Sequence, residues 1–126
     1  MLSLDGNTAP YLLYSYARCR SIQRKGEIAS PAVRGIVLAA PEERAMALAL
    51  VHFPEAVAAA LEHHRPNLLC DHLFATANAL NRFYAECPVL SAEPAVRDAR
   101  LALVEATARV LERGLEILGI PTLARM

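Results

Sequence analysis

Apolar side chains recur every three or four residues along most of this chain, which is the spacing of an α-helix that buries one side. The first such segment begins near Asn7 or Thr8, either of which can cap a helix, and it tolerates Pro10 in its first turn. It can continue through Lys25 and end at Gly26, a residue suited to the left-handed conformation that often closes a helix. We therefore expect the first helix to span this segment.

This first helix is predicted to have two different faces. At about 100° per residue, one side carries apolar residues, namely Leu12, Leu13, Tyr16 and Cys19. The opposite side carries aromatic rings, cations and one hydroxyl, namely Tyr11, Tyr14, Arg18, Ser21 and Lys25. The first face is typical of a core contact, and the second is an aromatic-cationic face.

Proline and glycine divide the middle of the chain. Residues 26–40 hold Gly and Pro around a short apolar run, so we expect a connection of irregular structure there. A second helix is predicted to begin at Pro41 and to break or kink at Pro54. A further helical stretch is expected from Glu55 to about His64, and its Ala-rich sequence favours close helix packing.

Two long helices are predicted in the second half, over residues 66–86 and from about Pro94 to Gly119. The stripe expected on the former is Leu69, Leu73, Thr76, Ala77, Leu80, Phe83 and Tyr84. The stripe expected on the latter is Val96, Leu103, Val104, Thr107, Val110, Leu111 and Leu118. Gly114 lies inside the last helix at a cost of up to about 1 kcal/mol relative to Ala, so we expect close packing there.

Composition agrees with an all-α fold. Ala and Leu supply 43 of the 126 residues, Trp is absent and Gly numbers 5, a mixture that favours helix over sheet. This length suits one domain with one core, so we predict a single-domain helical bundle. Neither a signal peptide nor a run of about 18 uncharged apolar residues is evident, and we expect a soluble, cytoplasmic protein without a membrane contact.

A search for catalytic or metal-binding motifs predicts no active site. The four histidines have no metal-ligand spacing, and the glycines form no phosphate-binding loop. Neither GxSxG nor a Cys with a motif-placed His occurs. The carboxylate pair Glu42-Glu43 stands at a predicted helix start, where the helix dipole explains it. Three distant cysteines are expected to be reduced and mostly structural.

Charge is distributed unevenly, although the formal net charge is zero. The first 35 residues carry five basic and two acidic side chains, a net of +3, and the rest carry a net of −3. No acid lies between Asp5 and Glu27, where Arg18, Arg20, Arg24 and Lys25 occur. Zero net charge therefore does not exclude a nucleic-acid partner.

The aromatic-cationic face has two interpretations on helix geometry alone. Tyrosines spaced three residues apart beside an arginine make a platform on which unpaired bases can stack, each worth about 1–3 kcal/mol. The other interpretation is that the tyrosines are core residues and the cations a solvated face. Spacing does not separate these two.

Several segments resemble one family. The stretch DGNTAPYLLYSYARCRSIQRK, residues 5–25, is similar to the opening of the C-terminal anticodon-binding domain, often called DALR, of arginyl-tRNA synthetases. The second half agrees in FYAECPVL at 83–90, VRDARLALVEAT at 96–107, GLEILGI at 114–120 and a final Arg125-Met126. The resemblance is specific at the two ends of the chain and weak in the Ala-rich middle, about residues 36–66. Family members often carry Gln where this chain has Leu13.

The resemblance implies an all-α bundle of the class I aminoacyl-tRNA synthetase type that binds the anticodon stem-loop of arginine tRNA. Aromatic and arginine residues of the family's first helix meet the anticodon bases, and Tyr11, Tyr14 and Arg18 match them. Tyr84 matches an aromatic that faces the loop, and Met126 matches a terminal Met near the pocket for the central anticodon cytosine. Arg20, Arg24 and Lys25 are expected to attract phosphate less specifically. Of these we favour Lys25, because Arg20 and Arg24 lie nearer the apolar face.

The same resemblance predicts that residues 1–126 are one anticodon-binding domain, a fragment lacking the catalytic and N-terminal domains of the ligase. HIGH-like and KMSK-like signatures are absent from the sequence, and its abrupt start within the motif favours a fragment. We therefore expect no cofactor here, whereas the parent enzyme would use ATP and Mg²⁺ to join arginine to its tRNA. The expected partners are arginine tRNA and the catalytic domain of the same chain.

Two other functions remain open at this point. One is the equivalent domain of another synthetase, such as the cysteinyl enzyme. The other is a helical protein-interaction module that uses the Ala-rich helix and the histidines as its docking face.

Overall fold

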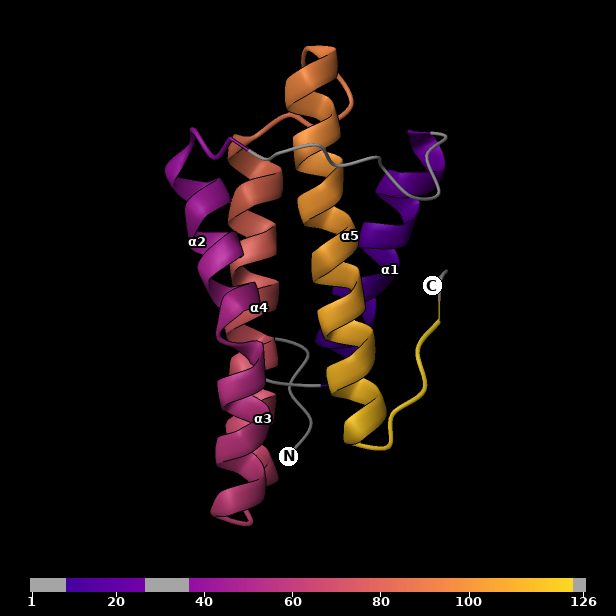
Figure 1. The fold of residues 1–126 in the computed structure, drawn as a ribbon. Helices are drawn as coiled ribbons and strands as arrows, with labels where there is room; N and C mark the ends of the chain where they lie inside the picture. Colours follow the sequence, from indigo (N-terminus) through magenta and orange to yellow (C-terminus); the bar gives the residue numbers. More distant parts are fainter. Residues whose placement is uncertain (1–8, 27–36, 124–126) are drawn as a thin grey trace.

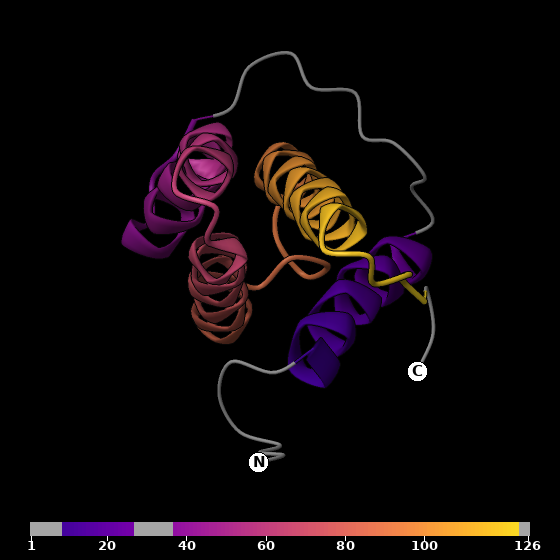
Figure 2. The same cartoon turned by 90° about the horizontal axis from the view of Figure 1, so that it is seen from below.

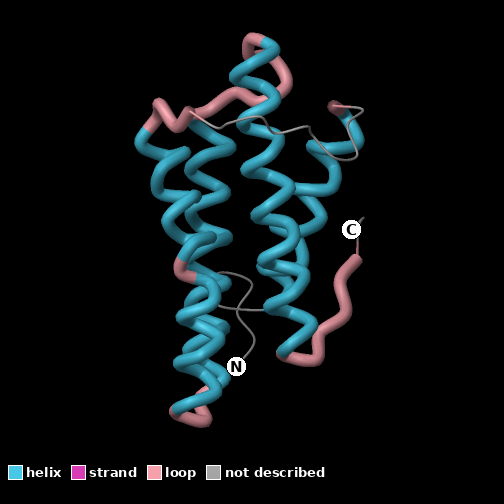
Figure 3. The backbone as a smooth tube through the Cα atoms, in the orientation of Figure 1, coloured by secondary structure: helices cyan, strands magenta, loops and turns pink. Residues whose placement is uncertain are grey.

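The protein is all-α in a computed structural model, which describes residues 9–26 and 37–123 (Figure 3). Its helices are α1 (Ala9–Lys25), α2 (Pro41–Val51), α3 (Phe53–Glu62), α4 (Pro66–Glu86) and α5 (Pro94–Ile117), shown in Figure 1. No strand occurs within these two ranges. The predicted helical bundle is confirmed, whereas the proposed capping residues Asn7 and Thr8 lie outside the described residues.

Prolines begin the helices where the sequence predicted. Pro41, Pro66 and Pro94 are the first residues of α2, α4 and α5, because a first-turn residue needs no hydrogen-bonded N–H. The predicted break in the middle of the chain is confirmed, although it falls at His52 and Pro54 belongs to the first turn of α3. Gly119 adopts φ +80° and stops α5, as expected of a glycine that ends a helix.

Gly26 follows α1 for a different reason from the one predicted. It does not take the left-handed conformation, and its N–H donates to the carbonyl of Ile22 at 3.0 Å, as in a continuing helix. A Cβ at this position would lie 3.2 Å from Leu90 Cδ2. The absence of a side chain therefore serves close packing, not a positive φ.

Figure 2, which views the bundle along its length, shows how the helices are arranged. Helices α4 and α5 pack against each other, and α2 and α3 form one column that lies mainly against α4. Helix α1 lies on the other side and packs mainly against α5. It also contacts α4, less extensively than α5.

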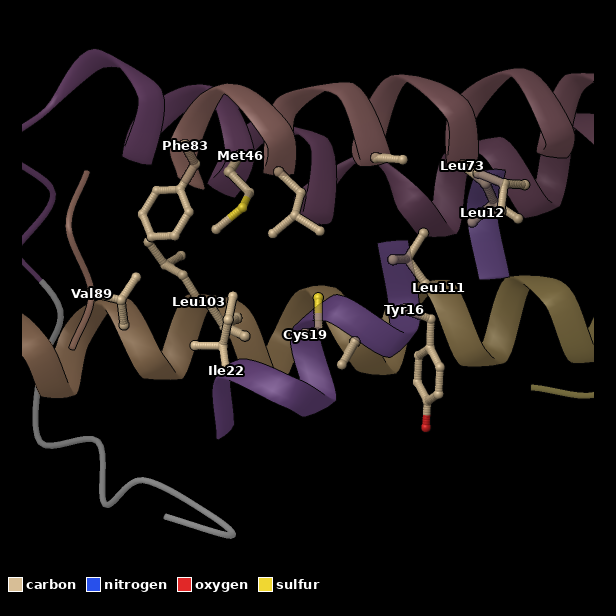
Figure 4. Packing of buried hydrophobic residues seen from close by; sticks show 14 of the residues in the cluster. Leu12, Tyr16, Cys19, Ile22, Met46, Leu73, Phe83, Val89, Leu103 and Leu111 are labelled. Carbon is tan, nitrogen blue, oxygen red and sulfur yellow. The ribbon is translucent and has the colours of Figure 1, made fainter. Parts of the chain in front are cut away.

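One hydrophobic core joins all these helices (Figure 4), although α3 buries no residue completely and meets the core through partly buried residues such as Phe53 and Val57. Cys19 and Ile22 of α1 enter the same cluster as Phe83 of α4 and Leu111 of α5. The predicted stripes are largely confirmed, and the exceptions are Tyr84 and Val96, which are 46% and 38% exposed. Figure 1 shows that the first turns of α5 extend beyond the ends of α2 and α4, which agrees with the partial exposure of Val96 in this part of α5.

Close packing at Gly114 is confirmed. A Cβ added to this glycine would lie 2.5 Å from Cδ2 and 2.7 Å from Cδ1 of Leu73. Both distances are far below ordinary van der Waals contact, so the glycine is what allows α4 and α5 to approach each other here.

The cysteines are free thiols: Cys19 and Cys87 are buried, and Cys70 is partly buried. Burial raises the pKa of Cys19 to about 12 and also raises the pKa values of Cys70 and Cys87. These thiols stay protonated near neutral pH, which suits packing and not nucleophilic chemistry.

By length and composition alone, one helical stretch, Pro41–Glu62, could cross a membrane. This stretch is not a run of uncharged residues, because a few charged residues interrupt the apolar ones. One of them, Glu43, forms a buried ion pair with Arg100, and the helix is interrupted at His52.

Candidate nucleic-acid interface

A cavity of about 830 Å³ lies between the second half of α1, the end of α4 and the turn that follows α4. Helix α1 lines it with Tyr14, Ala17, Arg18, Ser21, Ile22, Arg24 and Lys25. Its other side is formed by Tyr84, Ala85, Pro88, Val89, Leu90 and Ser91. We call this cavity the α1–α4 pocket.

The spacing along α1 explains which side chains reach the pocket. Tyr14, Arg18, Ser21 and Lys25 follow one another at three or four residues, so they share one edge of the helix. The opposite edge is held in the core by Leu12 and Cys19. The division of α1 into a core face and an aromatic-cationic face is confirmed for these residues, whereas Tyr11, predicted on the second face, does not line the pocket.

Two tyrosine rings in the pocket are exposed to solvent. Tyr14 of α1 is 51% exposed and Tyr84 of α4 is 46% exposed. Large aromatic side chains are usually buried in a folded protein because burial stabilises them. Two half-exposed rings on one cavity are therefore an apolar surface that a ligand can cover. This arrangement fits a partner with flat faces.

Arg18 lies between these two rings and links them. Its guanidinium carbon is 5.2 Å from the ring centroid of Tyr14 and 4.9 Å from that of Tyr84, both within cation–π range. It also donates to the hydroxyl of Tyr14 at 3.2 Å and to Oδ1 of Asn81 at 3.1 Å. These contacts hold the arginine at the pocket and orient its planar group.

The pocket is positively charged. Arg18, Arg24 and Lys25 line it, and none of its described lining residues is acidic. Arg24 and Lys25 also lie in the last turn of α1, where cations interact favourably with the helix dipole. The pocket therefore offers flat rings and cations together, the two features that single-stranded nucleic acids require.

The structure brings together four of the six residues predicted from the sequence to bind RNA. Tyr14, Arg18, Lys25 and Tyr84 all line the α1–α4 pocket. Met126 lies outside the described residues, and its predicted role stays a prediction.

Tyr11 lies elsewhere, between α1 and α4. Its ring is half-buried with its centroid 5.4 Å from that of Phe74, and its hydroxyl donates to Asn78 Oδ1 at 2.8 Å. The hydroxyl also accepts a hydrogen bond from the side-chain amide of Asn81. These contacts give Tyr11 a part in joining the helices, one turn before the pocket begins.

The expectation that Arg20 and Arg24 lie nearer the apolar face than Lys25 is confirmed for Arg20, which is partly buried against α5, and is wrong for Arg24. Arg24 is exposed and lines the pocket. Arg20 points to α5, where it donates to Glu105 at 2.9 Å and to Glu112 at 3.3 Å, and it also donates to the hydroxyl of Tyr16 on its own helix at 3.0 Å. The expectation that Arg20 attracts phosphate is not supported by this geometry, since its charge is already paired with carboxylates.

Glu105 completes this cluster on α5. Burial raises the pKa of its carboxyl, but hydrogen bonds from Arg109 and Gln23 and the charge of Arg20 lower that pKa below its usual value overall. The carboxylate is therefore charged at neutral pH and holds α1 against α5 through Arg20 and Gln23.

Sequence reasoning missed two parts of the site. Asn81 orients Arg18, and it lies three residues before Tyr84 on the same side of α4, a spacing that could have indicated it. The turn at 88–91 forms one wall of the pocket, and no periodic signal marks it, since it is irregular structure.

Comparisons with known proteins agree with this geometry. A family model described as the DALR anticodon binding domain matches residues 12–126. The chain is 47% identical over 128 residues to an arginine–tRNA ligase of Synechocystis sp. and 46% identical over 128 residues to one of Pseudomonas fluorescens. Each alignment covers 100% of this chain and 22% of the relative, so the chain spans about a fifth of the length of these curated relatives.

Solved structures show the same fold. The arginyl-tRNA synthetase of Thermus thermophilus aligns with a TM-score of 0.85 and 38% identity, over 98% of this chain and 22% of that one. The arginyl-tRNA synthetase of Plasmodium falciparum aligns with a TM-score of 0.82 and 22% identity, over 99% of this chain and 22% of that one. The second likeness, at this identity, concerns the fold alone.

Proposed function

This chain belongs to the DALR anticodon binding domain family, and from that premise we propose that its α1–α4 pocket binds the anticodon loop of an arginine tRNA. The single observation that carries the proposal is the pocket itself, in which two exposed tyrosines and three cations meet and no acidic residue occurs among the described residues that line it. The names of the relatives support arginine tRNA as the ligand.

The proposed mechanism is stacking combined with charge. Unpaired bases of the loop leave their own stack and lie against Tyr14 and Tyr84, which are accessible from solvent. Arg18 contacts a base edge or a phosphate from its position between the rings. Arg24 and Lys25, at the end of α1, attract the backbone with little dependence on sequence.

In this proposal the chain binds the tRNA during arginylation but does not itself catalyse the joining of arginine to the tRNA. We propose that the longer protein joins arginine to its tRNA with ATP and Mg²⁺ in a separate catalytic domain, and that this domain positions the tRNA. Met126 is proposed to lie beside the central anticodon base, as the family resemblance implies. The chain is also proposed to act in the cytoplasm, where translation takes place.

The test is a filter-binding comparison of three RNAs with the 126-residue chain. These are the arginine tRNA, the same tRNA with its central anticodon base changed, and an unrelated tRNA. We expect the first to bind tightest. Equal affinity for all three would contradict the proposal and favour a protein-interaction module.

Tyr14→Ala tests the pocket directly. We expect tRNA binding to weaken roughly tenfold or more, because stacking contributes about 1–3 kcal/mol per base, while the melting temperature stays nearly unchanged. Leu61→Ala is the matched control, since Leu61 is also large and exposed but lies on α3, outside the pocket. The stacking role is wrong if the Tyr14→Ala variant unfolds, or if it binds the arginine tRNA as tightly as the Leu61→Ala control does.

A further inference from the structure

Two arginines of α5, outside the pocket lining, hold the backbone of its two walls. Arg97 and Arg100 lie three residues apart and therefore share one side of α5. Arg97 donates to the carbonyl of Gly26 at the end of α1, at 3.0 Å. Arg100 donates to the carbonyl of Pro88 in the turn after α4, at 2.6 Å. Each arginine thus reaches a different wall.

The wall after α4 needs such a contact because it is irregular. Cys87 and Val89 anchor this turn in the core, but apolar contacts are not directional and do not fix how a backbone is oriented. Pro88 and Leu90, which face the pocket, are exposed. The hydrogen bond from Arg100 to the Pro88 carbonyl adds the direction that the apolar anchors lack.

Arg100 is itself held by a buried carboxylate. Its Nε donates to Glu43 at 3.0 Å, and the side chains of Glu43 and Arg100 are only 4% and 16% exposed. Glu43 also accepts a hydrogen bond from the backbone N–H of Ala39. A charged pair that is this buried is costly unless both partners are fixed, so the contact with Glu43 restrains the guanidinium that donates to Pro88.

The wall formed by α1 is held in a similar way. The carbonyl of Gly26 stands at the end of a helix, where backbone acceptors lack partners within the helix, and Arg97 supplies one. A Cβ on Gly26 would lie 3.2 Å from Leu90 Cδ2, so the end of α1 comes close to the turn after α4. Arg97 and Arg100 therefore each donate to one of two wall segments that lie near each other.

We propose that Arg97 and Arg100 are positioning residues that fix the two walls of the α1–α4 pocket, with Glu43 orienting Arg100. The consequence for RNA binding rests on the proposed function. The effect on the walls does not, so the two can be tested separately.

The first experiment measures the wall without RNA. In Arg100→Met, we expect the backbone order parameters of Leu90 and Ser91 to fall from about 0.85, typical of rigid backbone, toward about 0.6. In Arg100→Lys, which keeps the charge but lacks the planar fork, we expect an intermediate loss. Order parameters equal to those of the unaltered chain in both variants would overturn the proposal, whatever the RNA does.

The second experiment measures whether removing the negative charge of Glu43 strengthens or weakens tRNA binding. Glu43→Gln removes a negative charge, and long-range electrostatics alone predict tighter binding of arginine tRNA. Positioning predicts the reverse, a loss of about tenfold, which corresponds to ~1.4 kcal/mol. Asp98→Asn is the matched control, because Asp98 is an exposed acid on the same helix as Arg100. Tighter binding in both variants would overturn the proposal.

A salt titration and a stability control complete the test. Arg100→Lys is expected to weaken binding with an unchanged dependence on salt, because Arg100 is not a phosphate contact. Gly114→Ala lowers stability at a site away from the pocket and shows whether lost stability alone weakens binding. If the unaltered chain binds no tRNA, the proposed function fails, and the order parameters still decide the positioning role.

Discussion

Arg18 and Arg20 lie two residues apart on α1, have the same side chain and have opposite surroundings. Arg18 has two exposed aromatic rings and the side-chain amide of Asn81 as neighbours. Arg20 has two carboxylates, and its guanidinium joins α1 to α5. The edge with Arg18 leaves a cation available to a ligand, and the edge with Arg20 uses a cation to assemble the bundle.

This difference shows that a count of basic residues does not locate an RNA-binding surface. All the cations of α1 contribute to the +3 charge of the first 35 residues, yet only part of that charge lines the pocket. A paired and partly buried charge is already compensated and adds little to the field that a phosphate experiences. The neighbours on α4 and α5 therefore decide the role of each arginine.

The largest expected effect comes from the Arg20 side of the comparison. Arg20→Met leaves Glu105 without one of its cations, and we expect a loss of about 2 kcal/mol of unfolding free energy. This is below the roughly 3–5 kcal/mol typical of broken buried pairs, because solvent still reaches Arg20 and Arg109 remains beside Glu105. Thermal or urea unfolding followed by circular dichroism measures it. An unchanged stability would show that the α5 cluster does not hold α1.

A somewhat smaller effect, on affinity instead of stability, is expected on the Arg18 side. Arg18→Met should weaken tRNA binding about tenfold, or ~1.4 kcal/mol, and lower stability by less than about 1 kcal/mol, because its contacts are cation–π pairs near the surface. Filter binding and melting of the same preparation give both numbers. Arg20→Met should therefore lower mainly the stability, and Arg18→Met should lower mainly the affinity for tRNA. Equal losses of stability in the two variants would contradict this comparison.

The smallest expected effect is on salt dependence. Lys25→Gln should reduce the slope of log affinity against log salt by about one phosphate contact, because Lys25 is an exposed cation that lines the pocket. Arg20→Met should leave this slope unchanged. Identical slopes for Lys25→Gln and the unaltered chain would remove Lys25 from the interface.

Local signals predicted most of the fold. Prolines marked the starts of α2, α4 and α5, since proline is compatible with a first turn and incompatible with a helix interior. Helical periodicity also placed Tyr14 and Leu12 on opposite sides of α1. Both signals depend only on residues that are close together in the sequence. They can therefore be recognised without knowing which segments are neighbours in the folded chain.

The rest depended on contacts between distant segments. Periodicity gave Tyr11 and Tyr14 the same face, and only the position of α4, with Phe74 and Asn78, makes Tyr11 a joint between helices. Glu43 was attributed to the helix dipole, whereas Arg100, 57 residues away, makes it half of a buried pair. No spacing rule relates residues so far apart in the chain.

The position of Arg18 between Tyr14 and Tyr84 has a thermodynamic consequence. Two neighbouring aromatic rings tend to collapse onto each other and exclude water, which would close the space a ligand needs. A planar guanidinium between them acts as a spacer, because it is flat and comparable in thickness to a nucleobase. The two rings are therefore already held apart in the folded chain, so a ligand that stacks on their exposed faces while Arg18 stays in place would cost little of their conformational entropy.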